Sequence, residues 1–484
     1  MESIWSKTVE LPKFAPLQGD LDTEAVVIGG GLAGLLTAYA LQQRNVKTVV
    51  LEAARIGSGQ TKGTTAKITL QHGIIYSKIK KDFGEEKARQ YALANQQAID
   101  EYRRLVNEKH IECSFRECPA YLYSPQQQDV QRLEEETAVA KELGIRAEFT
   151  TQTTLPFSVA GAMKFEGQAC FNPLAFLQPL SKELTIFEHT PVTTVEENRV
   201  VTKNGTVTAK HIVFACHFPF LNMPGFYFAR MHQDRSYVLA LENAPMLDGM
   251  YLGIDTEALS FRNYDGLLLF GGGDHRTGEN SAGGKYEFLR QRAAQLYPQS
   301  KETLHWSAQD CITLDGIPYI GQFSSSTPHW YVATGFAKWG MTSSMVSARL
   351  IADSITGVEN PCAEVFSPQR FTPTASMRSF VTDMGQAVKG ISRRAFQFPQ
   401  ENAAELPIGH GGIVEYNKEK VGVYKDEQGR VFAVSVRCPH LGCQLEWNPD
   451  EKSWDCPCHG SRFDYQGNLI GNPAQCDLER MAHE

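Results

Sequence analysis

Hydrophobic and polar residues follow different periods in successive stretches of the chain. Apolar residues recur every three or four positions in residues 84–109, 126–143 and 340–355, which predicts three helices with one apolar face each. Short apolar runs between turn residues dominate from about residue 150 to about residue 335 and predict strands, two of them around Asn204 and Gly205. From about residue 402, alternating segments with glycine turns predict a small all-β domain.

The helical and the late all-β regions are separated by residues 357–376, which are rich in proline, serine and threonine and are typical of a boundary. One more helix is predicted over residues 377–396. We therefore expect an α/β body over residues 1–370, a linker with a connector helix over 371–401, and the β domain over 402–484.

Composition narrows the class of protein. A chain of 484 residues with 42% hydrophobic content is too long for one core, and a net charge of −8 argues against nucleic acid as the main partner. The first residues lack the pattern of a signal peptide, and the longest uncharged apolar run, residues 25–41, is too short and glycine-rich for a membrane span. This predicts no transmembrane segment and leaves peripheral membrane contact open.

The eleven cysteines are unevenly distributed: six lie in the first 362 residues and five follow Arg437. A secreted disulfide framework would not be spread in this way. We expect a cytoplasmic protein with one metal-bearing end.

A glycine pattern near the amino terminus indicates a dinucleotide site. Gly29, Gly31 and Gly34 form G-x-G-x-x-G between a predicted strand and a predicted helix, and a second strand ends in Glu52. Such glycines let backbone N–H groups approach a pyrophosphate at the helix start, and the acidic residue can bind a ribose hydroxyl. Glutamate rather than a basic residue favours FAD or NAD over NADP.

Three further segments, residues 54–73, 305–321 and 333–344, decide between these nucleotides. Together with the glycine pattern they resemble the FAD-dependent amino-acid and amine oxidases of the D-amino-acid oxidase type, which include glycine and sarcosine oxidases. The resemblance covers about residues 20–370 and implies a Rossmann-like α/β FAD-binding domain with an α+β substrate domain. It places FAD-binding segments at about residues 22–80, 165–225 and 310–357, and substrate segments at about 84–165 and 226–310.

The same resemblance implies the remaining contacts with FAD. A helix that starts near Gly340 would direct its positive dipole end at the flavin edge that becomes negative on reduction. The expected FAD-binding residues beside the glycine pattern and Glu52 are Thr64, Thr65, Val192, Gly335, Gly340, Met341 and Thr342. No second G-x-G-x-x-G is present, so we expect electrons to enter by oxidation of a small molecule, as hydride to the flavin.

The substrate-binding residues are less determined by the sequence. Asp310 stands where glycine-oxidase-like members carry the arginine that binds the substrate carboxylate. A carboxylate there favours an amine or another cation, although an Asp turned outward to cap a turn fits the pattern equally. Lys67 and His72 are expected on the reactive side of the flavin, or else hold the loop structure.

Near the other end, residues 438–461 contain four cysteines and two histidines. A zinc site, two disulfides and a Rieske 2Fe–2S centre are the alternatives. The C-x-C half is too tight for a zinc knuckle, and disulfides leave both histidines unexplained. Cys438-x-His440 and Cys456-x-x-His459, with 15 residues between them, each supply one thiolate and one imidazole, as a Rieske centre requires.

This stretch closely resembles Rieske domains. The resemblance implies that Cys438 and Cys456 bind one iron, and that His440 and His459 bind the other. It also implies a disulfide between Cys443 and Cys458, as in the quinol–cytochrome c reductase type, and a proline loop over residues 471–474. Ser461 matches the serine that bonds the cluster, whereas Phe463 stands where high-potential members carry tyrosine. We therefore expect a potential below the top of the roughly −150 to +300 mV Rieske range.

Both ends together predict an FAD-dependent oxidoreductase that oxidises a small substrate, an amine or an amino acid, and passes electrons through the cluster to an acceptor protein or a quinone. The alternative is a non-catalytic electron-transfer or redox-sensing protein. A Rieske oxygenase is disfavoured, because the close pair His211 and His217 has no suitably placed carboxylate for a mononuclear iron.

Overall fold

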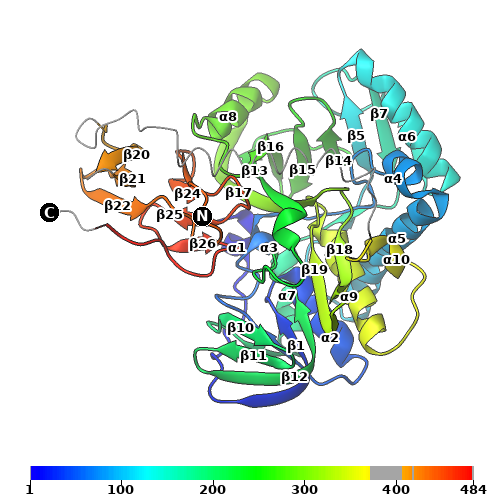
Figure 1. Ribbon diagram of the computed structural model, residues 1–484. Helices are drawn as coiled ribbons and strands as arrows, with labels where there is room; N and C mark the ends of the chain where they lie inside the picture. The colour runs from blue at the N-terminus through cyan, green and yellow to red at the C-terminus, as the bar shows by residue number, and fades with distance from the viewer. Residues whose placement is uncertain (1, 371–405, 417–418, 482–484) are drawn as a thin grey trace.

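The computed structural model describes residues 2–370, 406–416 and 419–481. The body contains two eight-stranded sheets, and the carboxyl-terminal domain lies to one side of it (Figure 1). The predicted connector helix over residues 377–396 lies outside the described residues. In the part of the chain that the structure describes, no helix combines the length and apolar composition needed to cross a bilayer.

The first sheet, here called the nucleotide sheet, is built around a parallel core in which β1 pairs with β12 and with β2. Its path is β10-β11-β12-β1-β2-β9, and β19 pairs with both β12 and β18. Its central strand β1 is fully buried over its second half, as expected for a strand covered on both faces. The strands are β1 (Leu21–Ile28), β2 (Thr48–Leu51), β9 (Thr185–Phe187), β10 (Val192–Glu196), β11 (Arg199–Thr202), β12 (Gly205–Phe214), β18 (Tyr319–Ser324) and β19 (Thr327–Thr334).

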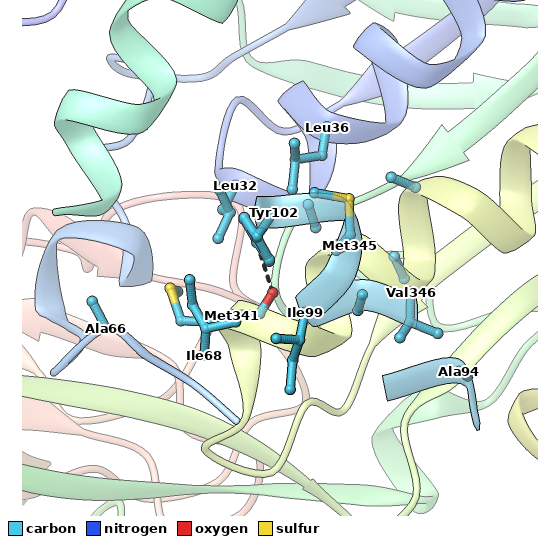
Figure 2. Packing of buried hydrophobic residues seen from close by; sticks show 14 of the residues in the cluster. Leu32, Leu36, Ala66, Ile68, Ala94, Ile99, Tyr102, Met341, Met345 and Val346 are labelled. Carbon is cyan, nitrogen blue, oxygen red and sulfur yellow. Dashed lines mark hydrogen bonds between the residues drawn. The ribbon is translucent and has the colours of Figure 1, made fainter. Parts of the chain in front are cut away.

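Three helices pack together beside the nucleotide sheet: α2 (Leu32–Gln42), α5 (Glu85–Glu108) and α9 (Gly340–Ile355). Figure 2 shows side chains of all three interlocking, and the Tyr102 hydroxyl donates a hydrogen bond of 2.8 Å to the Met341 carbonyl at the start of α9. Because α2 is buried on nearly all sides, its sequence is almost uniformly apolar. This core fixes where the amino-terminal ends of α2 and α9 point.

The second sheet, here called the outer sheet, has the order β17-β13-β16-β15-β14-β5-β7-β6. The long antiparallel strands β13 and β17 pair along nearly their whole length and form its edge nearest the carboxyl-terminal domain (Figure 1). The strands are β5 (Ala120–Ser124), β6 (Ala147–Thr150), β7 (Gly161–Phe165), β13 (Met231–Glu242), β14 (Met250–Gly253), β15 (Ser260–Tyr264), β16 (Leu267–Arg276) and β17 (Lys301–Thr313).

The remaining elements of the body cover these sheets or connect them. Asn172 caps α7 by accepting hydrogen bonds from two backbone N–H groups, with proline at the first helical position. A small sheet joins β3 (Lys67–Ile68), β8 (Ala169–Cys170) and β4 (Arg116–Glu117). The other helices are α1 (Ile4–Thr8), α3 (Gln60–Gly63), α4 (Tyr76–Phe83), α6 (Val130–Glu142), α7 (Pro173–Ser181), α8 (Lys285–Leu296) and α10 (Ala363–Phe366), with 3-10 turns at Gln127–Asp129 and Tyr227–Ala229.

The carboxyl-terminal domain is all-β, as its alternating pattern predicted. One sheet has the order β20-β21-β22 and the other β23-β24-β25-β26. Its main core contains Trp447, Trp454 and Phe463 together with four buried cysteines. The strands are β20 (Gly411–Tyr416), β21 (Glu419–Lys425), β22 (Val431–Ser435), β23 (Glu446–Asn448), β24 (Ser453–Asp455), β25 (Arg462–Asp464) and β26 (Leu469–Gly471).

The helices predicted from apolar periodicity match α5, α6 and α9 closely, and the two strands predicted around Asn204–Gly205 are β11 and β12. The predicted fold class is therefore confirmed: an α/β nucleotide domain, a second domain built on the outer sheet, and a small all-β domain.

Candidate functional site

A cavity of about 590 Å³ lies between the nucleotide sheet and the outer sheet. Its wall combines the glycine-rich turn after β1, the end of β2, the start of α9 and parts of β13 and β17. Residues 469–472, 474 and 475 of the carboxyl-terminal domain complete the wall. The cavity is thus bounded by all three domains.

The glycine-rich turn brings backbone close to the cavity. Gly29 has φ +113°, and a Cβ there would lie 2.4 Å from the Ala215 carbonyl oxygen. A Cβ on Gly34 would lie 1.9 Å from the Gly29 carbonyl oxygen, so only glycine lets α2 pack against this turn. Gly29 and Gly31 line the cavity, whereas Gly34 lies behind them. Helix α2 has Gly31 as its N-cap and no capping side chain there. The Leu32 N–H donates to Thr61 Oγ1 at 3.0 Å, and the N–H groups that follow it in the first turn suit an anion.

Glu52 lies at the end of β2 and lines the same cavity. Its carboxylate accepts hydrogen bonds of 2.7 Å from the Gly30 N–H and 2.8 Å from the Ala54 N–H. Burial raises the pKa of this carboxyl group, and the two backbone N–H groups oppose the rise. The side chain therefore braces the glycine turn while it faces the expected ribose position.

The other predicted nucleotide contacts divide into two groups. Six of them line the cavity: Thr64, Thr65, Val192, Gly335, Gly340 and Met341. The last two begin α9, which has no side-chain cap. Thr342 is not part of the wall; its hydroxyl donates to the Thr69 carbonyl. The open helix start at the cavity matches the dipole placement predicted for α9.

His72 does not line the cavity, contrary to one expectation. Its ring stacks on Trp339 with centroids 4.7 Å apart, and it is Trp339 that belongs to the cavity wall. Its Nε2 contacts the Thr69 carbonyl and its Nδ1 the Tyr91 hydroxyl, each at 2.6 Å. Burial lowers the pKa of this imidazole to about 3, so it is neutral and fully hydrogen-bonded, as a residue that holds the loop would be.

Lys67 and Asp310 both line the cavity. Burial, together with the nearby Arg262 guanidinium, lowers the pKa of the Lys67 amine to about 7, and its Nζ donates to the Tyr251 carbonyl at 3.0 Å. Burial raises the pKa of Asp310 to about 6; Lys338 opposes this rise, and the carboxylate of Asp274 adds to it. A poorly solvated amine and carboxylate therefore face one cavity, as is typical of sites that move protons.

The two cluster loops are residues 438–443 and residues 456–461. The disulfide between Cys443 and Cys458 joins them. The nearby Cys456 thiol lowers the pKa of Cys438. The rings of His440 and His459 lie with centroids 4.9 Å apart and planes perpendicular. The four predicted ligands are thus brought together at one end of the domain.

The chemistry of these donors fits a Rieske cluster. The Nδ1 atom of His440 is buried and has no hydrogen-bond partner, while its Nε2 lies 2.7 Å from Asn222 Oδ1. Because an amide oxygen accepts, Nε2 carries the proton and Nδ1 offers its lone pair to a metal. The backbone N–H groups of residues 440 and 441 and the Ser461 hydroxyl also lower the pKa of the Cys438 thiol, which favours the thiolate that a cluster needs.

Cys443, Cys456 and Cys458 also lie within metal-ligand distance of one another. Since two of these three sulfurs form the disulfide, this group offers only one thiolate and does not compete as a zinc site.

Polar side chains hold the carboxyl-terminal domain against the body, and the sequence did not reveal these contacts. Asn472 donates to the backbone carbonyls of Cys216 and Phe218 at 2.7 and 2.6 Å. Farther along the same interface, Glu451 pairs with Arg235 of β13 and, at 3.1 Å, with Arg462. No sequence motif marks these contacts, so only the docked structure identifies them.

Comparisons with known proteins agree with these two sites. The family model described as FAD dependent oxidoreductase (DAO) matches residues 24–354, and the Rieske 2Fe-2S domain model matches residues 397–482. YhfW of Bacillus subtilis (strain 168), whose name describes a Rieske 2Fe-2S iron-sulfur protein, is 37% identical over 495 residues, which is 99% of this chain and 97% of that protein. The cytochrome b6-f complex iron-sulfur subunit of Chlorobaculum thiosulfatiphilum is 35% identical over 78 residues, 16% of this chain and 42% of its own length.

Solved structures match the body. L-proline dehydrogenase from P. horikoshii has a TM-score of 0.61 at 18% identity, covering 73% of this chain and 98% of that one. Glycine oxidase from Geobacillus kaustophilus has a TM-score of 0.59 at 18% identity, covering 72% and 99%. At this identity the likeness shows the fold, and the family matches add FAD and a 2Fe–2S cluster as cofactors. The chain belongs to the DAO family of FAD-dependent oxidoreductases and carries a Rieske 2Fe–2S domain at its carboxyl-terminal end.

Proposed function

We propose that this enzyme oxidises a small amine or amino acid at a C–N bond and passes the electrons through its Rieske cluster to an external acceptor, a protein or a quinone. One observation supports this most: the cavity lined by the nucleotide motif is closed by residues of the cluster domain, such as Asn472. The two redox centres would therefore share a wall.

When bound, FAD supplies the two-electron acceptor for the substrate hydride, and the cluster supplies a one-electron outlet. The protein binds and orients the substrate. The cavity lining contains the carboxylates of Asp310 and Asp274, and Lys338 is paired with Asp274. Glu52 also lines the cavity but is bonded to the glycine turn, so Asp310 is the carboxylate left to attract a substrate ammonium group. This favours an amine or the amino end of an amino acid.

Lys67 is the proposed proton acceptor. With its pKa near 7, the amine is neutral above that pH and can take the proton that a substrate ammonium must lose before hydride transfer. Asp310 is ionised above a pH of about 6. Both side chains are in the productive form above pH 7, so the rate of substrate oxidation is expected to rise as pH passes through about 7 and then to level off.

The test is anaerobic mixing of the holoenzyme with a panel of amines and amino acids, with flavin absorbance and cluster EPR recorded. A substrate should bleach the flavin and then produce the EPR signal of the reduced cluster. If the flavin bleaches and the cluster stays EPR-silent, electron relay is wrong. If no member of the panel bleaches the flavin, the non-catalytic alternative is favoured.

Matched variants test the two side chains. Lys67→Met should lower kcat/KM by about 100-fold, the scale of general base catalysis, and remove the rise near pH 7. Lys62→Met, in α3 outside the cavity wall, is the control. Asp310→Asn should weaken the binding of cationic substrates, whereas Asp234→Asn, at the facing position of β13, should leave their binding unchanged. An unchanged pH profile in Lys67→Met would contradict the assignment.

A further inference from the structure

We propose that Gln233 and Gln309 are positioning residues that fix the second cluster loop on the cavity wall and provide the path for electrons from the flavin to the cluster. This inference rests on the proposed relay. It concerns two buried polar side chains on adjacent strands, β13 and β17, neither of which belongs to the nucleotide motif or to the cluster motif.

Both glutamines bind the backbone of the cluster loop directly. Gln233 Nε2 donates to the His459 carbonyl at 2.7 Å and to the Asn472 carbonyl at 3.1 Å. Gln309 Nε2 donates to the Gly460 carbonyl at 2.7 Å. Two consecutive peptide groups, one of them that of a cluster ligand, are therefore held by the body of the enzyme.

Both glutamines also contact residues that line the cavity, Gln233 through its side-chain oxygen and Gln309 through its backbone N–H. Gln233 Oε1 lies 3.0 Å from His217 Nε2, and His217 lines the cavity. The backbone N–H of Gln309 donates to Gln60 Oε1 at 2.7 Å, and Gln60 is also part of the wall. Each glutamine thus bridges the cavity lining and the cluster loop by hydrogen bonds alone.

The close approach of the second cluster loop to the two glutamines depends on a glycine. Gly460 has φ +82°, and a Cβ there would lie 2.6 Å from Gln233 Cβ and 2.8 Å from the Nε2 atom of each glutamine. Gln233 and Gln309 are both only 2% exposed. Buried amides are costly unless they are hydrogen-bonded, so this arrangement has little freedom to shift.

The contact at Asn280 does not bridge the cavity lining and the second cluster loop. Asn280 donates to Asp450 Oδ2 at 2.8 Å and to Asn448 Oδ1 at 3.1 Å. These partners precede the second cluster loop, and Asn280 does not line the cavity. Asn280 therefore holds the domain in place without joining the two redox sites, and it provides a matched control.

Electrons would pass from the flavin to the cluster one at a time. Each passage moves one electron from the reduced flavin to the oxidised cluster, where one Fe(III) becomes Fe(II). An external one-electron acceptor removes that electron before the second passage. After two passages the flavin is oxidised, and the proton from its reduced form has gone to solvent.

The experiment uses the full-length holoenzyme and no substrate. Photoexcited deazaflavin with EDTA reduces the flavin in a flash, and absorbance and EPR follow electron arrival at the cluster. Gln233→Leu and Gln309→Leu should each slow this second phase by about tenfold or more, because short-range reaction rates depend steeply on geometry. The flavin-reduction phase and the cluster potential should stay as in the wild type, and Asn280→Leu should leave both phases unchanged.

A second measurement is independent of electron transfer. Hydrogen exchange of the oxidised full-length chain should speed up in residues 456–461 for either glutamine variant. For Asn280→Leu it should speed up in residues 446–455 instead. Since each glutamine is tested alone, the proposal remains open to refutation if one variant fails to fold.

The outcomes separate the two proposals. Absence of the second phase in the wild-type enzyme would overturn the relay itself. A wild-type second phase that both glutamine variants retain at full rate would overturn the path. Equal slowing in Asn280→Leu would also overturn it, because docking in general would then be the cause.

Discussion

The cavity and the cluster site differ in how their residues are distributed along the chain. The cavity wall runs from Ile28 to Gln475 and draws on strands and helices of all three domains. The predicted cluster ligands lie between Cys438 and His459, on two loops joined by a disulfide. A site made from neighbouring residues can be lost by one local change, whereas a dispersed site depends on the packing that brings its parts together.

Loss of one cluster ligand is the largest expected effect and separates the two sites. Cys438→Ser should abolish the Rieske EPR signal while FAD stays bound in full, because Cys438 is not part of the cavity wall. EPR and FAD release per chain measure the two outcomes. Cys476→Ser, at an exposed free cysteine, is the control. Concurrent loss of FAD would show that the sites are not separable.

Breaking the contact between the domains comes next. Glu451→Gln leaves the buried Arg235 and Arg462 short of a charge partner, which should cost about 3 kcal/mol in free energy of unfolding. Urea titration of the full-length chain, with the cluster absorbance as the signal, measures it. The exposed Glu427→Gln should cost well under about 1 kcal/mol.

The same carboxylate predicts a pH dependence. Although burial opposes ionisation, Arg235 and Arg462 lower the pKa of Glu451 to about 2, below about 4.3 for an unfolded glutamate. Its stabilisation is therefore fully present above about pH 4.3 and is lost as pH falls towards 2. The stability difference between wild type and Glu451→Gln should shrink over this range, and a constant difference would contradict the ion-pair account.

Disturbing the glycine turn tests the dispersed site. Gly34→Ala places a methyl group against the Gly29 carbonyl and should weaken FAD binding by about 3 kcal/mol, or roughly 100-fold. The fluorescence of released FAD measures the affinity. Gly59→Ala is the control, because Gly59 lines the cavity itself and has open space around it. The cluster signal should stay at the wild-type level in both variants.

The smallest expected effect is a change in the reduction potential of the cluster. Phe463→Tyr should raise the reduction potential by about 59 mV if the new hydroxyl contributes about 1.4 kcal/mol as a hydrogen bond to sulfur. Redox titration by EPR measures it. Phe432→Tyr, in the same domain and only packed against its core, should leave the potential unchanged. An unchanged potential in Phe463→Tyr would mean that position 463 does not reach a ligand sulfur.

The sequence predicted those parts of the two sites that are formed by residues close together in the chain. The glycine turn, Glu52 and the Cys-x-His pairs could be predicted because one short segment contains all the residues that each motif needs. His72 was expected at the cavity, but Trp339 takes that place, since spacing along a loop does not say which side chain packs in front. Gln233 and Gln309 on strands and Glu451 in a turn were not predicted, because such a polar residue gains its role only when another domain docks on it.

The hydrogen bonds between the body and the cluster domain would also make electron transfer between them an intramolecular step. Two redox domains on separate chains must first associate, whereas here both domains belong to one chain and are already in contact. The effective concentration of the cluster at the cavity wall is then set by the fold and not by the cell. The internal rate should be independent of enzyme concentration, and only the final acceptor remains subject to diffusion.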